Sequence, residues 1–159
     1  MSETASAAVT ELLREYPVMI VVPVAWGDMD ARQHVNNVVY FRFFESGRIA
    51  YFERIQGMRP DSETPADPAQ GSILASAACR YKFPLTYPDT LSVGTRVIRV
   101  EADRYTLQCR IVSQRHARIA AECEGVIVAY DYAALQKMLL PEHARRAIAE
   151  IERSAGNEL

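Results

Sequence analysis

The chain has 159 residues, of which 49% are hydrophobic and 24% charged, a composition typical of one globular domain with a sizeable core. Its formal net charge of −2 offers no excess of positive charge for DNA or an anionic membrane surface. We therefore expect neither nucleic acid nor a membrane as a partner, while a local basic pocket for a phosphorylated ligand stays open.

The first ten residues lack both the basic start and the apolar core of a signal peptide. The longest uncharged apolar run, residues 17–26, is shorter than the ~20 residues that a helix needs to cross a bilayer. The three cysteines, Cys79, Cys109 and Cys123, form no Cys-x-x-Cys motif and are expected to be reduced thiols packed as small hydrophobic side chains. These features predict a cytoplasmic protein.

The first third of the chain predicts a short turn, a strand and a loop. The turn is expected at residues 10–15, and the Val- and Ile-rich run 18–26 suits a buried strand. Pro23 restricts that strand to an edge or a bulge, because proline donates no ladder hydrogen bond. Residues 28–36 then read as a loop.

A long helix is predicted over residues 37–56, about five turns, with Asn36 or Asn37 as its cap and Gly57 as its stop. Four apolar side chains share one helical face, and three more spread the apolar surface around most of the circumference: Tyr40, Phe44, Tyr51 and Ile55, then Phe41, Ile49 and Phe52. Such a helix is expected to be buried, so other elements must wrap around it.

The proline-rich run 59–71 reads as a loop. Four strand-like runs follow, joined by short turns that favour antiparallel hairpins: 72–83, 90–102, 105–114 and 117–130. A short helix is expected at about 141–153, starting at Pro141 and carrying an apolar stripe of Ala144, Ile148 and Ile151.

This order of elements predicts an α+β hotdog fold, in which a curved antiparallel sheet of about five strands wraps around one long central helix. The whole chain, 1–159, reads as a single domain with its core at about 18–132. A curved sheet of this kind leaves edges and an open flank, which a homodimer or homotetramer would cover.

The segment Trp26–Asn37 is the most informative stretch, because it places carboxylates, an imidazole and two amides at the entrance of the long helix. A helix entrance carries unpaired N–H donors and a partial positive charge. A carboxylate beside such donors is what hydrolysis of an activated acyl group needs. Asp30 is the first choice for that carboxylate, and an Asx turn or a helix-entry cap is the alternative role.

The sequence resembles the 4-hydroxybenzoyl-CoA thioesterase-like family of hotdog acyl-CoA thioesterases at five places: Gly27–Asp30, His34–Asn37, Tyr40–Glu45, Arg80–Phe83 and Tyr87–Leu91. The resemblance covers about residues 18–130 and is specific for the superfamily rather than for a substrate. It implies hydrolysis of acyl-CoA thioesters by dimers or dimers of dimers, with no metal and no cofactor apart from the coenzyme A of the substrate.

The resemblance also implies roles for individual residues. Asp30 matches the essential carboxylate, and the backbone N–H of Asn37 matches the donor that polarises the thioester carbonyl. Many members of that family have glycine where this chain has Gln33, so a stiffer loop and a narrower entrance are expected.

Three neighbours complete the expected site. His34 is a candidate to orient Asp30, bind a substrate oxygen or shuttle a proton, with hydrogen bonding to the loop backbone as the alternative. Asn36 is expected to brace the loop beside the substrate, and Tyr40 is the aromatic side chain best placed to touch the acyl group.

Lys82, Arg115 and Arg118 are candidates to hold the phosphates of coenzyme A, although solvated strand faces use the same residues. Asp28 is expected mainly to stabilise the turn, and Glu45 to pair with Arg48 three residues on. The D-x-D-x-x-x-H run alone is weak evidence for a metal site, so we expect none.

The sequence therefore predicts an acyl-CoA thioesterase that releases a free acid and coenzyme A. Two alternatives remain open at this point. One keeps the chemistry but uses an acyl carrier protein (ACP) in place of coenzyme A, and the other is a non-catalytic binder of acyl-CoA.

Overall fold

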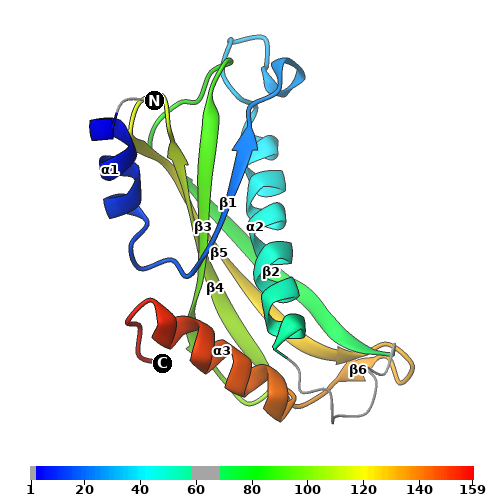
Figure 1. The fold of residues 1–159 in the computed structure, drawn as a ribbon. Coiled ribbons are helices and arrows are strands. Elements are labelled where there is room, and N and C mark those ends of the chain that lie inside the picture. The colour runs from blue at the N-terminus through cyan, green and yellow to red at the C-terminus, as the bar shows by residue number, and fades with distance from the viewer. Residues whose placement is uncertain (1–2, 59–68) are drawn as a thin grey trace.

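The computed structural model describes residues 3–58 and 69–159. Its elements in chain order are α1 (Glu3–Leu12), β1 (Val18–Pro23), the 3-10 helix η1 (Trp26–Asp28), α2 (Asn37–Gly57), β2 (Gln70–Tyr81), β3 (Thr90–Val100), β4 (Arg104–Ser113), β5 (Arg118–Asp131), β6 (Gln136–Lys137) and α3 (Glu142–Ser154). One curved sheet runs between α1 and the long helix α2 (Figure 1). The expected α+β arrangement, an antiparallel sheet curled around one long helix, is confirmed.

The sheet order is β1-β3-β4-β5-β2, with the two-residue strand β6 added beside β5. Every pairing is antiparallel, as the short connections predicted. Strand β1 lies at one edge and ends at Pro23, so the restriction that proline imposes is satisfied. Strand β2 forms the other edge, and among the described strands only β5 pairs with it.

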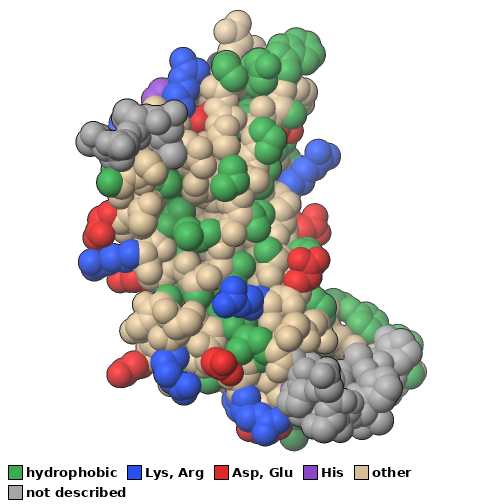
Figure 2. All heavy atoms as spheres, in the orientation of Figure 1, with side chains coloured by type: hydrophobic (Ala, Val, Ile, Leu, Met, Phe, Trp, Pro, Cys, Tyr) green, Lys and Arg blue, Asp and Glu red, His purple; other side chains and the backbone are tan. Residues whose placement is uncertain are grey.

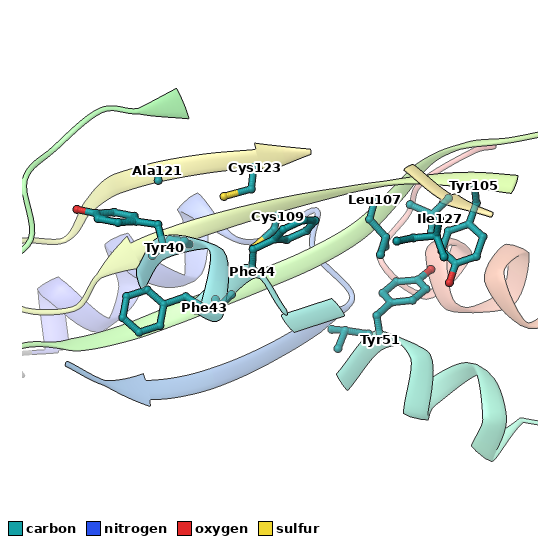
Figure 3. Packing of buried hydrophobic residues seen from close by; sticks show 14 of the residues in the cluster. Tyr40, Phe43, Phe44, Tyr51, Tyr105, Leu107, Cys109, Ala121, Cys123 and Ile127 are labelled. Atoms are coloured by element: carbon teal, nitrogen blue, oxygen red, sulfur yellow. The ribbon is translucent and has the colours of Figure 1, made fainter. Parts of the chain in front are cut away.

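The buried face of α2 is the one that its sequence predicted. Tyr40, Phe44, Tyr51 and Ile55 are each at most 3% exposed. Figure 3 shows Phe44 beside Cys109, and Tyr51 turned toward Leu107, Tyr105 and Ile127 of the sheet. Gly47 lets the helix approach the sheet closely, because a Cβ added there would lie 2.5 Å from the Thr95 hydroxyl oxygen.

The expectation that α2 is buried around most of its circumference is wrong for the single chain. Phe41 is 36% exposed and Ile49 is 42% exposed, while Phe52 is half-buried. The sheet and α3 cover only part of the helix, so Phe41 and Ile49 lie partly exposed on the remainder. Figure 2 shows hydrophobic side chains spread over the face of the molecule that carries α2.

The turn predicted at residues 10–15 is confirmed only for residues 13–15, because the chain forms the helix α1 from residue 3 to residue 12. This helix and the residues after it pack Val9, Leu13 and Tyr16 against Val112 on the outer face of the sheet. Pro141 caps α3 rather than occupying its first turn, and most of the predicted loop 59–71 lies outside the described residues.

The three cysteines stand in a row across β2, β5 and β4, with Cys79 paired opposite Cys123 and Cys123 opposite Cys109. All three are free thiols, Cys109 and Cys123 are buried, and Cys79 is half-buried. Burial raises the pKa of Cys109 to about 12, so this thiol stays protonated. The expectation of thiols packed as small hydrophobic side chains is confirmed for Cys109 and Cys123.

Candidate active site

The loop between β1 and α2 is a compact turn closed by backbone hydrogen bonds. Met29 and Val35 form an isolated antiparallel bridge, and the Asp30 N–H donates to the His34 carbonyl at 2.8 Å. Gln33 closes the turn with φ of 61°, in the left-handed region that glycine adopts most easily. This explains why many members of the resembling family have glycine at this position. Gln33 adopts the same φ at some conformational cost.

The loop is fixed to the segment that follows β2. The Val35 N–H donates to the Leu85 carbonyl at 2.8 Å, and the Tyr87 N–H lies 3.3 Å from the Met29 sulfur. The Asn36 N–H donates to the Asp28 carbonyl at 2.9 Å, which holds the start of α2 beside the start of the loop. Asp30 and Asn37 therefore belong to one closed turn, although six residues separate them.

Asp30 is half-buried, and its two carboxylate oxygens differ in their hydrogen bonding. Its Oδ1 accepts the N–H of Arg32 at 2.7 Å and the N–H of His34 at 3.4 Å. Its Oδ2 has no hydrogen-bond donor among residues 3–58 and 69–159. The Asx-turn role is thus present, and it leaves one carboxylate oxygen available for chemistry. Asp28 has the turn-stabilising role that was expected, since its Oδ2 accepts the Ala25 N–H at 2.8 Å.

The start of α2 presents an exposed donor beside this turn. Asn36 is the N-cap, and its Oδ1 accepts the Val38 N–H at 3.0 Å. The Asn37 N–H finds no acceptor in the described part of the chain, and the residue is exposed. An unpaired N–H at the positive end of a helix of 21 residues is suited to stabilise developing negative charge.

Tyr40 and Tyr81 form an aromatic wall below the helix start. Their rings meet edge to face with centroids 5.0 Å apart, and the Tyr81 hydroxyl donates to the Asn37 carbonyl at 3.0 Å. The Tyr40 hydroxyl accepts the Leu85 N–H at 3.2 Å, and burial raises its pKa. Tyr40 is only 3% exposed whereas Tyr81 is 45% exposed, so Tyr81 is the better placed of the two to meet a substrate.

Sequence reasoning did not single out Tyr81 as a site residue. Its signal was its place at the end of a predicted strand, inside one of the stretches that carry the family resemblance. The His34 ring, by contrast, is exposed and has no hydrogen-bond partner among the described residues, so it does not orient Asp30 here.

Lys82 does not reach this turn. Its ammonium group lies 2.5 Å from the Glu122 carboxylate, which Arg110 also binds at 3.0 Å. The neighbours of Glu122 along β5, Ala121 and Cys123, belong to the core beneath α2. Because successive strand residues point to opposite faces, Glu122 and its cations lie on the outer face of the sheet.

Arg115, His116 and Arg118 form a basic corner at the turn between β4 and β5. The Arg115 guanidinium donates to the Pro88 carbonyl at 3.1 Å, and the Arg118 guanidinium lies 5.0 Å from the centre of the Phe83 ring. His116 and Arg118 are exposed. The segment 83–89 thus contacts the basic corner and also holds the Asp30 loop.

The described residues contain no group of three or more His, Cys, Asp or Glu side chains arranged to hold a metal ion. Among the helices in the described ranges, none is both long enough and apolar enough to cross a membrane.

A model of the thioesterase-like superfamily matches residues 24–148, most of the chain. The chain belongs to this superfamily. The match includes the Asp30 loop, α2 and every strand after it, so the family predicted from the motifs is confirmed. No curated protein sequence matches the chain significantly.

Solved structures of superfamily members share the fold. A thioesterase from Thermus thermophilus, crystallised with coenzyme A and Zn, is 26% identical with a TM-score of 0.74, covering 91% of this chain and 98% of that one. A thioesterase superfamily protein from Jannaschia sp. CCS1 is 20% identical with a TM-score of 0.78, covering 95% and 91%. A DHNA-CoA thioesterase from Staphylococcus aureus is 15% identical with a TM-score of 0.73, covering 89% and 96%. These matches establish a hotdog fold.

Proposed function

We propose that this member of the thioesterase-like superfamily is an acyl-CoA thioesterase, in which Asp30 and the start of α2 carry the reaction. The observation that carries the proposal is the pairing of two uncommitted groups at one closed turn, Asp30 Oδ2 and the Asn37 N–H. One is a base or nucleophile, and the other is a donor for an oxyanion.

The reaction converts an acyl-CoA and water into a free acid and coenzyme A. Asp30 either removes a proton from the attacking water or attacks the carbonyl carbon itself, and water then hydrolyses the anhydride that forms. The Asn37 N–H stabilises the negative charge on the carbonyl oxygen, an interaction worth about 3 kcal/mol in acyl transfer. The C–S bond breaks, and the departing sulfur takes up a proton to leave as a thiol.

Coenzyme A is the favoured carrier because of the basic corner. Arg115 and Arg118 lie across segment 83–89 from the catalytic turn, where they can bind the phosphates of a carrier whose thioester reaches Asp30. The Thermus relative, which was crystallised with coenzyme A, supports the same carrier. Lys82 is left out of this role, because Glu122 neutralises it on the outer face.

The proposed working form is at least a homodimer. Strand β2 has an edge that no described strand pairs with, and Leu74 on this strand is 40% exposed. The exposed part of α2 adds the apolar side chains of Phe41 and Ile49. On that helix Arg48 Nη2 pairs with the exposed Glu45 carboxylate at 3.4 Å, as predicted, while its buried Nε has no hydrogen-bond partner among the described residues. A second copy placed on this flank covers the edge and the apolar groups.

The test is the pair Asp30→Asn and Asp28→Asn, assayed on a panel of acyl-CoAs by release of free thiol. Asp30→Asn is expected to lower kcat by roughly 100-fold or more, because the amide neither accepts the proton nor attacks the carbonyl. Asp28→Asn makes the same change of charge two residues away and keeps an oxygen for the Ala25 N–H. Near wild-type turnover by Asp30→Asn would refute the assignment.

The same panel separates the alternatives. Saturable binding of an acyl-CoA without thiol release by the wild-type protein would indicate a non-catalytic binder. A much higher rate when the same acyl group is carried by ACP would indicate that the carrier is a protein.

A further inference from the structure

The hydroxyl of Tyr81 binds the backbone at the start of α2. It donates to the Asn37 carbonyl at 3.0 Å, and Asn37 is the residue whose N–H is the proposed oxyanion donor. Tyr81 is the last residue of β2, so this hydrogen bond joins the sheet to the first residue of the helix. Burial raises the pKa of Tyr81, so the hydroxyl stays protonated at neutral pH and acts as the donor.

The backbone on either side of the Asn37 N–H is also held by hydrogen bonds. The Asn36 N–H donates to the Asp28 carbonyl at 2.9 Å, and the Asn36 carbonyl accepts the Val39 N–H at 2.9 Å. The Val38 N–H donates to Asn36 Oδ1 at 3.0 Å. These three bonds all lie within residues 28–39. They fix the shape of the helix start, whereas the bond from Tyr81 fixes its position against the sheet.

The Tyr81 hydroxyl is not needed to satisfy the helix backbone. In an α-helix the carbonyl of the first residue already accepts the N–H four residues on, which here belongs to Phe41. Asn37 is exposed, so water can replace the hydroxyl at its carbonyl and no buried group is left unpaired. Water would satisfy the carbonyl without fixing its direction, because water is not attached to the sheet. The bond therefore contributes orientation more than stability.

Tyr81 is itself held firmly enough to transmit the position of the sheet. Its backbone pairs with Ala121 of β5, and its ring meets the Tyr40 ring edge to face with centroids 5.0 Å apart. Tyr40 is 3% exposed, and its hydroxyl accepts the Leu85 N–H at 3.2 Å. A side chain locked by packing and by a hydrogen bond can hold a catalytic donor within the narrow geometry that a reaction needs.

We propose that Tyr81 is a positioning residue, whose hydroxyl aligns the Asn37 N–H with the oxygen of the thioester carbonyl. This inference rests on the proposed thioesterase function. A catalytic group misplaced by about 1 Å can cost roughly 100-fold in rate, so a helix start that moves against the sheet would stabilise the oxyanion poorly. Tyr81 is 45% exposed, so its ring can still line the substrate while its hydroxyl holds the backbone.

Tyr81→Phe tests the proposal, because it keeps the ring and removes only the hydroxyl. Its kcat is expected to fall by roughly tenfold on acetyl-CoA, hexanoyl-CoA and benzoyl-CoA alike, with KM within about twofold of the wild type, since an oxyanion donor serves the transition state of every thioester. Tyr132→Phe is the matched control and should keep the wild-type kcat. Its hydroxyl also donates to a backbone carbonyl at an exposed site, that of Ser72, at 2.9 Å.

Both variants are expected to melt within about 4 °C of the wild type. A larger loss of thermal stability in Tyr81→Phe would make the hydroxyl a structural group and overturn the proposal, as would an unchanged kcat. A rise in KM, or a loss of kcat that differs between acyl groups, would mean that the hydroxyl touches the substrate. A change in the alkaline limb of the pH profile of kcat would make Tyr81 a proton donor, because a positioning residue exchanges no proton.

Amide hydrogen exchange followed by NMR tests the positioning without any substrate. The N–H groups of Val38 and Val39 should exchange faster in Tyr81→Phe than in the wild type, whereas those of β4 should not change. A fall in kcat with unchanged exchange at Val38 and Val39 would mean that the hydroxyl does not act through the backbone, and the proposal would be wrong.

The two proposals fail in different ways. A wild-type protein that hydrolyses no thioester would end the proposed function, whatever the exchange rates at the helix start. A wild-type enzyme that is active, together with a Tyr81→Phe variant that is equally active, would leave the thioesterase intact and remove only the role of Tyr81.

Discussion

Tyr51 and Glu152 join the central helix to the C-terminal helix through a hydrogen bond of 2.6 Å inside the core. Both residues are 0% exposed. The same carboxylate oxygen accepts the Val97 N–H at 2.7 Å, and its other oxygen accepts the Asn157 side-chain amide at 2.7 Å. Burial and the neighbouring carboxylate raise the pKa of Tyr51, so its hydroxyl stays protonated as the donor. One buried carboxylate thus ties α2, α3 and β3 together.

Replacing Tyr51 by phenylalanine should lower the free energy of unfolding by roughly 2 kcal/mol, the usual worth of a hydrogen bond to a charged group. The change leaves a buried carboxylate with one donor fewer, which no water can replace at a fully buried position. Urea denaturation measures the difference. Tyr132→Phe is the control, because its hydroxyl donates to the Ser72 carbonyl at an exposed site and its loss should cost less than ~1 kcal/mol.

Glu152 also shows what the sequence did not reveal. The helical spacing of Ala144, Ile148 and Ile151 predicted the buried stripe of α3, and all three are buried. Glu152 follows Ile151 and reads as a solvent-facing charge, since glutamate is almost never fully buried unless it is paired. Two of its three side-chain partners, Tyr51 and Val97, lie 101 and 55 residues away in the chain, so no local pattern could indicate its burial.

Gly47 and Gly57 of α2 offer a matched pair for testing how closely the helix packs on the sheet. Gly47→Ala should destabilise the protein by about 1–3 kcal/mol, because the new methyl group would overlap the Thr95 hydroxyl and the Val93 side chain. At Gly57 none of the described residues beyond its chain neighbours and its own helix backbone has an atom within 4 Å of an added Cβ. Gly57→Ala should therefore be neutral or stabilise by up to about 1 kcal/mol through helix propensity. Thermal unfolding of both variants tests this prediction. Equal effects would contradict the close packing of α2 on the sheet at Gly47.

The pKa of Glu122 predicts how stability depends on pH. Partial burial alone would raise this pKa, but the hydrogen bonds from Lys82 and Arg110 outweigh it and hold the pKa below the ordinary value of 4.5. The stability from this carboxylate is present above pH 4.5 and is lost as the pH falls through the lowered pKa of the folded protein.

Glu122→Gln should therefore be less stable than the wild type at pH 7, by about 1 kcal/mol for a partly exposed ion pair. The difference should shrink as the pH falls below about 4.5 and disappear below the lowered pKa of the folded protein, where the wild-type carboxylate also becomes neutral. Urea midpoints measured from pH 7 to pH 3 test this. Glu124→Gln, exposed and on the same face of β5, serves as the control. A difference that stays constant with pH would contradict the role of the carboxylate.

How well the role of each candidate site residue could be predicted depends on how far away in the sequence its interaction partners lie. The helix-cap role of Asn36, one of the two caps predicted, and the turn role of Asp28 are confirmed, because a cap and a tight turn depend on residues within three positions. The ion pair of Lys82 with Glu122 could not be predicted, because it depends on the register of β2 against β5, and the pairing of distant strands leaves no local pattern at Lys82 itself. The exposure of Phe41 and Ile49 was misjudged because the apolar pattern of α2 does not say whether its own sheet or another molecule covers it.

Arg118 carries the last prediction, which concerns the coenzyme A carrier. Its guanidinium stacks on Phe83 and remains exposed, so it can bind a phosphate without losing an existing ion pair among the described residues. Arg118→Ala should raise KM for a short acyl-CoA by roughly tenfold, since one hydrogen bond to a charged group is worth at least ~1.5 kcal/mol. KM for the matching acyl-pantetheine thioester, which lacks the nucleotide, should not change.

Arg99→Ala is the matched control for this comparison, because Arg99 is an exposed arginine at the far end of β3 from the catalytic turn. It should leave both KM values near those of the wild type. An equal rise in KM for the acyl-CoA and the acyl-pantetheine substrate in Arg118→Ala would mean that the substitution disturbs the catalytic turn through segment 83–89. The basic corner would then hold the loop in place rather than bind the phosphates of the carrier.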